Sequence, residues 1–204
     1  MSEAAFVPVV FLTGARAVGK STIGYALFTR LNRTVAKSAY MDLAQLGFCR
    51  PVPADDPQHH RLKATVLAAG WRTFRDAGAR HLVVTGVIGA QHDFDRYRWA
   101  LGPVPVMVVR LDADPPALAE RVALRARGAG PAIPGDELRG LGVSEQQAVI
   151  EQALRQVSAV AADLVLDTTA LTVAEATSAL FDQIAARASR TASSSSAIPR
   201  QPPL

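Results

Sequence analysis

The sequence is poor in cysteine and in lysine. Cys49 is the only cysteine of the 204 residues, which excludes an intrachain disulfide and a zinc site built from several cysteines. Lysine occurs only as Lys20, Lys37 and Lys63, whereas arginines are numerous. No apolar run reaches the length of a membrane span. Met1–Ala5 have neither a basic region nor a signal-like apolar core, so we expect a cytoplasmic location by default.

Long blocks of one charge are also missing. The formal net charge is +4 and the pI is about 9.7, but the arginines are spread along the whole chain. This pattern gives little support to nucleic-acid binding, and a site for a polyanionic nucleotide explains the excess more simply. We expect one folded domain over residues 1–188 and a disordered Ser- and Pro-rich tail over 189–204. The oligomeric state stays open.

Against this background, residues 14–21 match the pattern G-x-x-x-x-G-K-[ST] without a mismatch. Gly14 and Gly19 let the backbone approach an anion closely, and the amides of such a loop point into one concavity. Lys20 can reach the β- and γ-phosphates, and the Ser21 hydroxyl can ligate Mg²⁺. The residues that we expect to bind the nucleotide phosphates are Gly14, Ala15, Arg16, Ala17, Val18, Gly19, Lys20, Ser21 and Thr22.

Apolar runs alternate with helical patterns along the chain. Five runs predict strands, at Val7–Leu12, Ser38–Met41, His81–Thr85, Val104–Leu111 and Asp163–Leu166. The helices are expected at Thr22–Leu31, Gln58–Ala77, Phe94–Leu101, Pro115–Arg127, from Glu145 to about Ala161, and from Thr172 to about Ala188. Asp114 is a candidate N-cap, and the pairs Ser144–Gln147 and Thr172–Glu175 read as capping boxes. Alternation of this kind predicts an α/β fold with a parallel sheet covered by helices on both faces.

Ligands of such sheets bind beyond the carboxyl ends of the strands. Asp42 follows the second strand, where it could deprotonate an acceptor hydroxyl, serve the Mg²⁺ shell or merely cap a turn. The third strand ends in Thr85-Gly86 rather than in an acidic residue, which disfavours a motor or AAA-type protein. Gly86 instead predicts a tight approach to a small substrate. The fourth strand could supply an acidic residue in Asp112, but this residue leads directly into a proline-started helix, so its role stays ambiguous.

Arginines near the lid and at the start of the second long helix are further candidate site residues. Arg125 and Arg127 precede the Gly- and Pro-rich segment 128–142, which we expect to be mobile. Arginines on a closing lid, here residues 121–142, stabilise charge on a transferring phosphoryl group. Arg125 is therefore a candidate catalytic residue, and Arg125 and Arg127 are candidate nucleotide-binding residues. A solvated helix face is the alternative, and Arg121 could equally pair with a carboxylate. Arg61 is a candidate for acceptor recognition.

Taken together, these features resemble the P-loop kinases of small molecules, such as shikimate, gluconate and adenylylsulfate kinases and chloramphenicol phosphotransferase. The phosphate loop, Asp42, the helix carrying Arg121 to Arg127, and the segment Asp163–Thr168 carry the resemblance. It implies a three-layer fold with a five-stranded sheet in the order 2-3-1-4-5, ATP with Mg²⁺, and a hydroxyl acceptor. It also implies that Thr168 lies near the adenine. Position 44 is Ala and the segment after Thr85 is not a triple glycine, so shikimate is not supported as the acceptor.

The sequence therefore predicts an ATP-dependent small-molecule kinase, with Lys20, Asp42 and Arg125 as catalytic residues and Ser21 and Asp42 at the metal. Asp42, Arg61 and Gly86 are the expected acceptor-binding residues. The alternative is an ATP-binding regulatory switch, or an NTPase without a small-molecule acceptor.

Overall fold

The structure is a computed structural model that describes residues 7–34, 37–130, 137–155 and 159–195, with the backbone alone for 188–195. Within these ranges lie five strands, six α-helices and one 3₁₀ helix. The strands are β1 (Val9–Gly14), β2 (Ser38–Asp42), β3 (His81–Thr85), β4 (Val106–Asp112) and β5 (Leu164–Asp167). The helices are α1 (Lys20–Thr34), η2 (Gln45–Gly47), α2 (His60–Asp76), α3 (Gln91–Leu101), α4 (Pro115–Ala126), α5 (Val143–Arg155) and α6 (Val173–Ser195).

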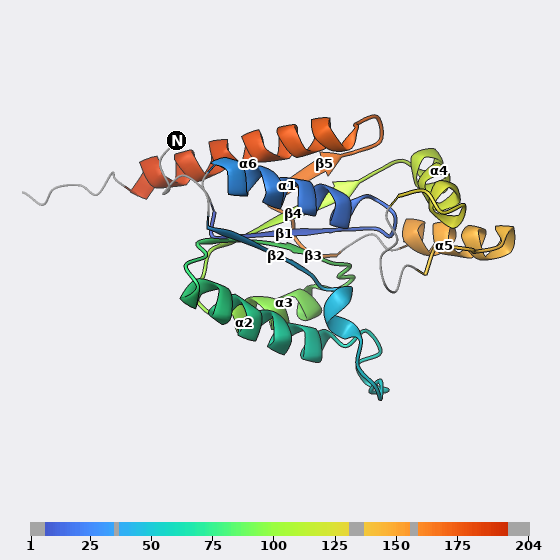
Figure 1. Cartoon of the computed structure of the whole chain (residues 1–204), viewed down its shortest axis with the longest axis horizontal. Coiled ribbons are helices and arrows are strands. Elements are labelled where there is room, and N and C mark those ends of the chain that lie inside the picture. Colours follow the sequence, from blue (N-terminus) through green and yellow to red (C-terminus); the bar gives the residue numbers. More distant parts are fainter. Residues whose placement is uncertain (1–6, 35–36, 131–136, 156–158, 196–204) are drawn as a thin grey trace, which may run out of the picture.

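The strands form one sheet in the order β2-β3-β1-β4-β5, and every pair is parallel. This confirms the expected order. Helices α1 and α6 cover one face, and α2 and α3 cover the other (Figure 1). Helices α4 and α5 pack on each other beyond the end of the sheet where β4 stops. All five strands thus end at one edge, which collects the loops that follow them.

The central strand explains the two cores. Every side chain of β1 is buried, because neighbouring strands and helices cover both of its faces. Val10 and Leu12 pack with Leu27 and Leu180 under α1 and α6. On the opposite face, Phe11 packs among α2 and α3 side chains, including an edge-to-face contact with Phe94 at 5.4 Å between ring centroids.

Two predicted helix starts are confirmed. The Asp114 carboxylate accepts a hydrogen bond from the amide of Ala117, with proline in the first turn of α4. At α6, Thr172 and Glu175 form a reciprocal capping box, because each side chain accepts from the amide of the other residue.

Two other predictions about helix ends are wrong. Helix α5 begins at Val143, where Glu145 accepts from the Gly142 amide, so the proposed Ser144–Gln147 box is not formed. The helix does not continue to Ala161 either, because residues 159–163 run non-helically into β5. There Val160 is buried under α2 and α3, and this tertiary contact overrides the helical propensity of an alanine-rich segment.

The C-terminal helix is longer than expected. Helix α6 continues to Ser195, so residues 189–195 of the predicted tail are helical. Residues 196–204 lie outside the described part of the chain, and their disorder stays a prediction. Among the described helices, none is both long and apolar enough to cross a membrane.

Candidate nucleotide and acceptor site

The phosphate loop joins β1 to α1 and depends on glycine at its start. Gly14 has a φ of 140°, and a Cβ placed on it would lie 2.3 Å from the Leu111 carbonyl oxygen of β4. Only glycine fits there without moving the neighbouring strand. Gly19 has a φ of 101°, and Ala17 also lies in the left-handed region with a φ of 63°.

The loop leaves several backbone donors without protein partners. Within the described residues, the amides of Arg16, Ala17, Gly19 and Lys20 donate to no protein acceptor. Unpaired N–H groups at the start of a helix, together with the positive end of its dipole, form a site for an anion. The loop can therefore hold a phosphate chain.

Lys20 is folded onto this loop. Its side chain is only 9% exposed, and the ammonium group donates to the Ala15 carbonyl at 2.7 Å. Burial lowers the pKa of Lys20 to about 8, Asp42 acts in the opposite direction, and Arg16 lowers it further. A buried cation with one carbonyl partner is poorly compensated, and a phosphate would supply the missing charge.

Asp42 ends β2 and faces the start of α1 through Tyr40. The Tyr40 hydroxyl donates to Asp42 Oδ2 at 3.3 Å and lies 3.0 Å from Thr85 Oγ1 and 3.4 Å from the Ser21 carbonyl oxygen. The other carboxylate oxygen of Asp42 accepts from the Ala44 amide at 2.9 Å. One oxygen therefore serves the turn, as the capping alternative predicts, and the carboxylate is still held beside Ser21.

These donors suit a hard cation. The Ser21 hydroxyl and the Asp42 carboxylate are oxygen ligands, which Mg²⁺ prefers, and Mg²⁺ usually completes its shell with phosphates and water. In the described part of the chain, no group of three or more His, Cys, Asp or Glu side chains could hold a metal alone. A metal at this position would thus be shared with the nucleotide.

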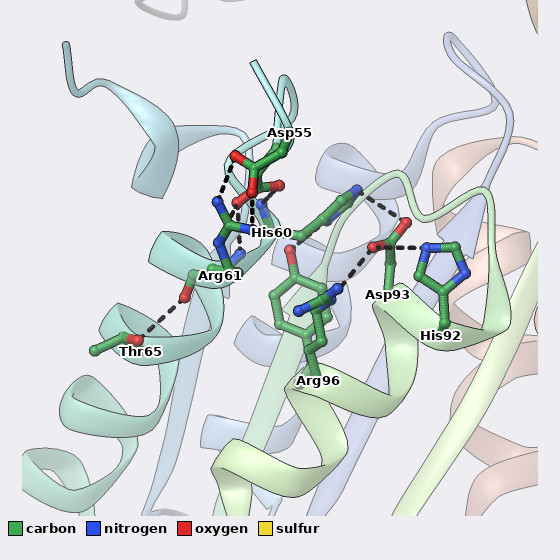
Figure 2. A network of polar contacts seen from close by, with 9 residues as sticks. Asp55, His60, Arg61, Thr65, His92, Asp93 and Arg96 are labelled. Atoms are coloured by element: carbon green, nitrogen blue, oxygen red, sulfur yellow. Dashed lines mark hydrogen bonds and ion pairs between the residues drawn. The ribbon is translucent and has the colours of Figure 1, made fainter. Parts of the chain in front are cut away.

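Gly86 and Arg61, two of the predicted acceptor residues, have structural partners. Gly86 is buried, and a Cβ on it would lie 2.7 Å from Leu43 Cδ1, so packing explains the glycine. The Arg61 guanidinium donates twice to Asp55 at 2.8 Å and lies 3.7 Å from Asp56 (Figure 2). Neither contact tests acceptor binding, which remains a prediction for both residues.

The same network ties α2 to α3. Asp56 accepts from the His60 and Arg61 amides and so satisfies two backbone donors in the first turn of α2. The His60 ring lies 2.8 Å from the Tyr97 hydroxyl and 3.6 Å from Asp93 (Figure 2). Burial lowers the pKa of His60, against the effect of Asp93. The sequence favoured ordinary surface charge for His60, but the structure buries it against Tyr97 and Asp93, because this pairing depends on the approach of two helices.

On the other side of the loop, Arg121 joins the phosphate loop to the turn after β5. It donates to the Val18 carbonyl at 3.3 Å, and to Thr168 Oγ1 and the Thr168 carbonyl at 3.0 and 2.6 Å. It therefore binds carbonyl and hydroxyl oxygens of the phosphate loop and of the turn after β5. Thr168 is 1% exposed, and its hydroxyl also donates to the Asp112 carbonyl at 2.9 Å.

The remaining lid residues lie at the end of α4. Arg125 is half-buried in its last turn, and Arg127 is exposed just beyond it. Arg16 of the phosphate loop forms an ion pair with Glu137, which follows the undescribed residues 131–136. Gly140 donates to the Ala126 carbonyl at 3.0 Å. The expected mobility of this segment stays a prediction.

Asp112, which the sequence left ambiguous, forms an ion pair with Arg110 at 3.0 Å between Nε and Oδ1. Lys20, Ser21 and Asp42 are thus brought together at one edge, and Thr168 is joined to the loop by Arg121. Arg61 belongs to a separate network, and Arg125 and Arg127 lie on the lid side.

Comparisons with known proteins agree with this architecture. A family model described as "AAA domain" matches residues 10–132. A search of curated proteins found no match.

Several solved structures share the fold. A gluconokinase from Sinorhizobium meliloti 1021 is 18% identical with a TM-score of 0.59, over 93% of this chain and 98% of that one. A shikimate kinase from Bacteroides thetaiotaomicron is 21% identical with a TM-score of 0.55, over 86% and 97%. A tunicamycin resistance protein from Deinococcus radiodurans is 21% identical with a TM-score of 0.53, over 89% and 95%.

At these identities the likeness establishes the fold. The expectation against an AAA-type protein, drawn from the end of the third strand, is wrong at the level of the family, although β3 does end at Thr85 without an acidic residue. The sheet has the strand order of the P-loop kinase fold. Since the family match covers more than half of the chain, this protein belongs to the AAA domain family.

Proposed function

We propose that this protein is an ATP-dependent phosphotransferase that moves the γ-phosphate to a hydroxyl of a small metabolite. One observation carries the proposal: the Tyr40 hydroxyl lies within hydrogen-bonding distance of both the Ser21 carbonyl and the Asp42 carboxylate. It holds an acidic group at the mouth of the phosphate loop, where an acceptor hydroxyl would meet the end of a triphosphate.

In this proposal the acceptor oxygen attacks the γ-phosphorus, and the bond from that phosphorus to the bridging oxygen of the β-phosphate breaks. ADP leaves with the bonding electron pair. The Asp42 carboxylate takes the hydroxyl proton and later releases it to water. Lys20 and the free loop amides hold the phosphates, and Arg125 or Arg127 lies over the transferred group.

The metal has a limited part. Ser21 and Asp42 would hold Mg²⁺, which neutralises charge on the β- and γ-phosphate oxygens. Thr168, joined to the loop through Arg121, is proposed to lie beside the nucleotide. Arg61 and Gly86 remain proposed acceptor residues that would act through the loop after β2 and the turn after β3.

A nucleotide-dependent switch is the second candidate, and the AAA family match favours keeping it. The test is release of ADP from Mg·ATP with and without a panel of hydroxyl compounds, with Lys20→Ala as the inactive control. Acceptor-stimulated release, with the phosphate found on the acceptor, is the expected result. Slow hydrolysis that no acceptor stimulates would support the switch.

A further inference from the structure

Lys63 is a cation that the proposed function has not used. It lies in the first turn of α2, at the same edge as Asp42, and its amide donates to the His59 carbonyl at 2.8 Å. The end of its side chain rests on Gly47 of η2. A Cβ at Gly47 would lie 2.5 Å from Lys63 Cε and 3.2 Å from Nζ, so the missing side chain makes room for this lysine.

The Lys63 ammonium lacks the direct partners that neighbouring cations have. Arg61 is paired with Asp55 and Asp56, and Arg96 lies 3.6 Å from Asp93. Within the part of the chain that the structure describes, no hydrogen bond or ion pair joins the half-buried Lys63 ammonium to another group. A half-buried charge without a partner is unfavourable, and a ligand of opposite charge relieves it.

Asp42 connects this lysine to the phosphate loop. Burial lowers the pKa of Lys63, and the carboxylates of Asp56 and Asp42 act in the opposite direction. The same Asp42 carboxylate also acts on the pKa of Lys20. Asp42 therefore lies close enough to interact with both ammonium groups, Lys20 on the phosphate side and Lys63 on the side of η2 and α2.

We propose that Lys63 binds an anionic group of the acceptor, such as a carboxylate or a phosphate, while the hydroxyl to be phosphorylated faces Asp42. This inference rests on the proposed function and narrows its substrate class to hydroxy compounds that carry a negative charge. Arg61, which the sequence favours for this task, is already neutralised by two carboxylates. Unlike Arg61, Lys63 can be reached by a ligand without first breaking an ion pair with a described residue.

The scarcity of lysine makes a direct test practical, because Lys20, Lys37 and Lys63 are the only three in the chain. Limited acetylation of the whole protein, followed by peptide mass spectrometry, reports each one separately. The probes are two pairs, gluconate with gluconamide and glycerol 3-phosphate with glycerol, each with Mg²⁺ and a non-hydrolysable ATP analogue. The anionic member of at least one pair should slow acetylation of Lys63 about tenfold, while the exposed Lys37 is unaffected.

The outcomes separate the two proposals. Protection of Lys20 by the nucleotide tests the phosphate site alone, so its absence would overturn the proposed function. If Lys20 is protected but both members of each pair protect Lys63 equally, or none does, the anionic-acceptor inference is overturned and nucleotide binding stands.

Variants give a second measurement with the acceptor identified in the ADP-release assay. Lys63→Met should raise the acceptor KM roughly ten- to a hundredfold and leave the KM for ATP unchanged, because only the charged contact is lost. Lys63→Arg should restore part of the affinity, and Lys37→Met is the matched control. Gly47→Ala, which pushes the ammonium aside without removing it, should fall between wild type and Lys63→Met. If every variant folds normally, an unchanged acceptor KM in Lys63→Met contradicts the inference.

Discussion

The two halves of the candidate site are built from different materials. The phosphate half consists mainly of backbone, namely free amides, two glycines with positive φ and the start of α1, with the Lys20 side chain folded onto it. The acceptor half consists of side chains that hold one another, from Tyr40 and Asp42 to the network between α2 and α3. The phosphate half tolerates few substitutions, because its backbone conformation depends on glycine. The acceptor half can change its substrate specificity through side-chain substitutions.

This contrast predicts that the halves fail in different ways. Asp42→Asn should reduce kcat by roughly 10²- to 10⁴-fold, because the proton acceptor is lost while the phosphate contacts are kept. The dissociation constant for ATP, measured by calorimetry, should change far less than kcat. Thr65→Ala, on an exposed face of α2, is a control that should leave both unchanged. A parallel loss of ATP affinity in Asp42→Asn would show that the phosphate half and the acceptor half do not act separately.

Lys20→Met should weaken ATP binding and yet stabilise the folded protein in the absence of nucleotide. ATP affinity should fall roughly ten- to a hundredfold, because a charge-assisted contact is lost. The free energy of unfolding at pH 7 should rise by roughly 1–3 kcal/mol, because the pKa of about 8 reflects an unfavourable buried charge.

The sign follows from linkage. The unfolded chain holds this proton more tightly than the folded one, so the penalty is fully present below pH 8 and disappears as the pH rises toward 10.5. The advantage of Lys20→Met in urea titrations should therefore shrink between pH 7 and pH 10. A constant difference would contradict the assignment.

Gly24 lies where the halves touch, and Gly24→Ala should damage both. A Cβ there would lie 2.2 Å from Thr85 Cγ2, and Thr85 is fully buried. We expect a loss of roughly 1–3 kcal/mol in the free energy of unfolding, because the stiff Thr85 side chain cannot move away. Gly89→Ala is the matched control, since nothing lies within 4 Å of a Cβ at that position. Equal stabilities by denaturant titration would show that α1 and β3 can separate without cost.

ATP binding should weaken above pH 8. Phosphate oxygens favour the Lys20 ammonium, so the complex holds a proton that the free protein, with a pKa of about 8, has partly lost. The affinity should fall by up to about tenfold between pH 7.5 and pH 9. Calorimetry in buffers of different ionisation enthalpy should detect proton uptake on binding near pH 8.5. In Lys20→Met this uptake should vanish.

The smallest effect concerns helix caps away from the site. Thr172→Ala should cost about 1 kcal/mol, because Thr172 Oγ1 accepts from the Glu175 amide at the start of α6. Ser144→Ala should cost almost nothing, because Ser144 lies inside the first turn of α5 and its proposed box is not formed. Thermal melts of the two variants compare a cap that the structure contains with one that only the sequence suggests.

The sequence predicted what short-range patterns control. Strand β3 matches its predicted bounds, His81–Thr85, because a continuous apolar run is bounded by polar and glycine residues. The phosphate loop and the Asp114 cap likewise depend on residues only a few positions apart.

The sequence could not predict contacts that the tertiary approach of elements decides. Tyr40 precedes Asp42 by two residues, so the shared strand face could have been noticed, but its contacts with Thr85 and Ser21 require β3 and α1 to be in place. The pairing of Arg61 with Asp55 and the burial of Val160 have no local signal at all.

The Tyr40 phenol has a mechanical consequence. Strand β2 lies at the margin of the described sheet and is hydrogen-bonded to β3 alone, yet in the proposed function it carries the carboxylate that acts beside the nucleotide. One hydroxyl near Ser21, Thr85 and Asp42 connects this outermost strand to helix α1, whose first turn belongs to the candidate phosphate site. In the proposed function, removing that oxygen would leave the contacts of both substrates in place but let β2 move relative to α1, so both substrates would still bind and turnover would be slower.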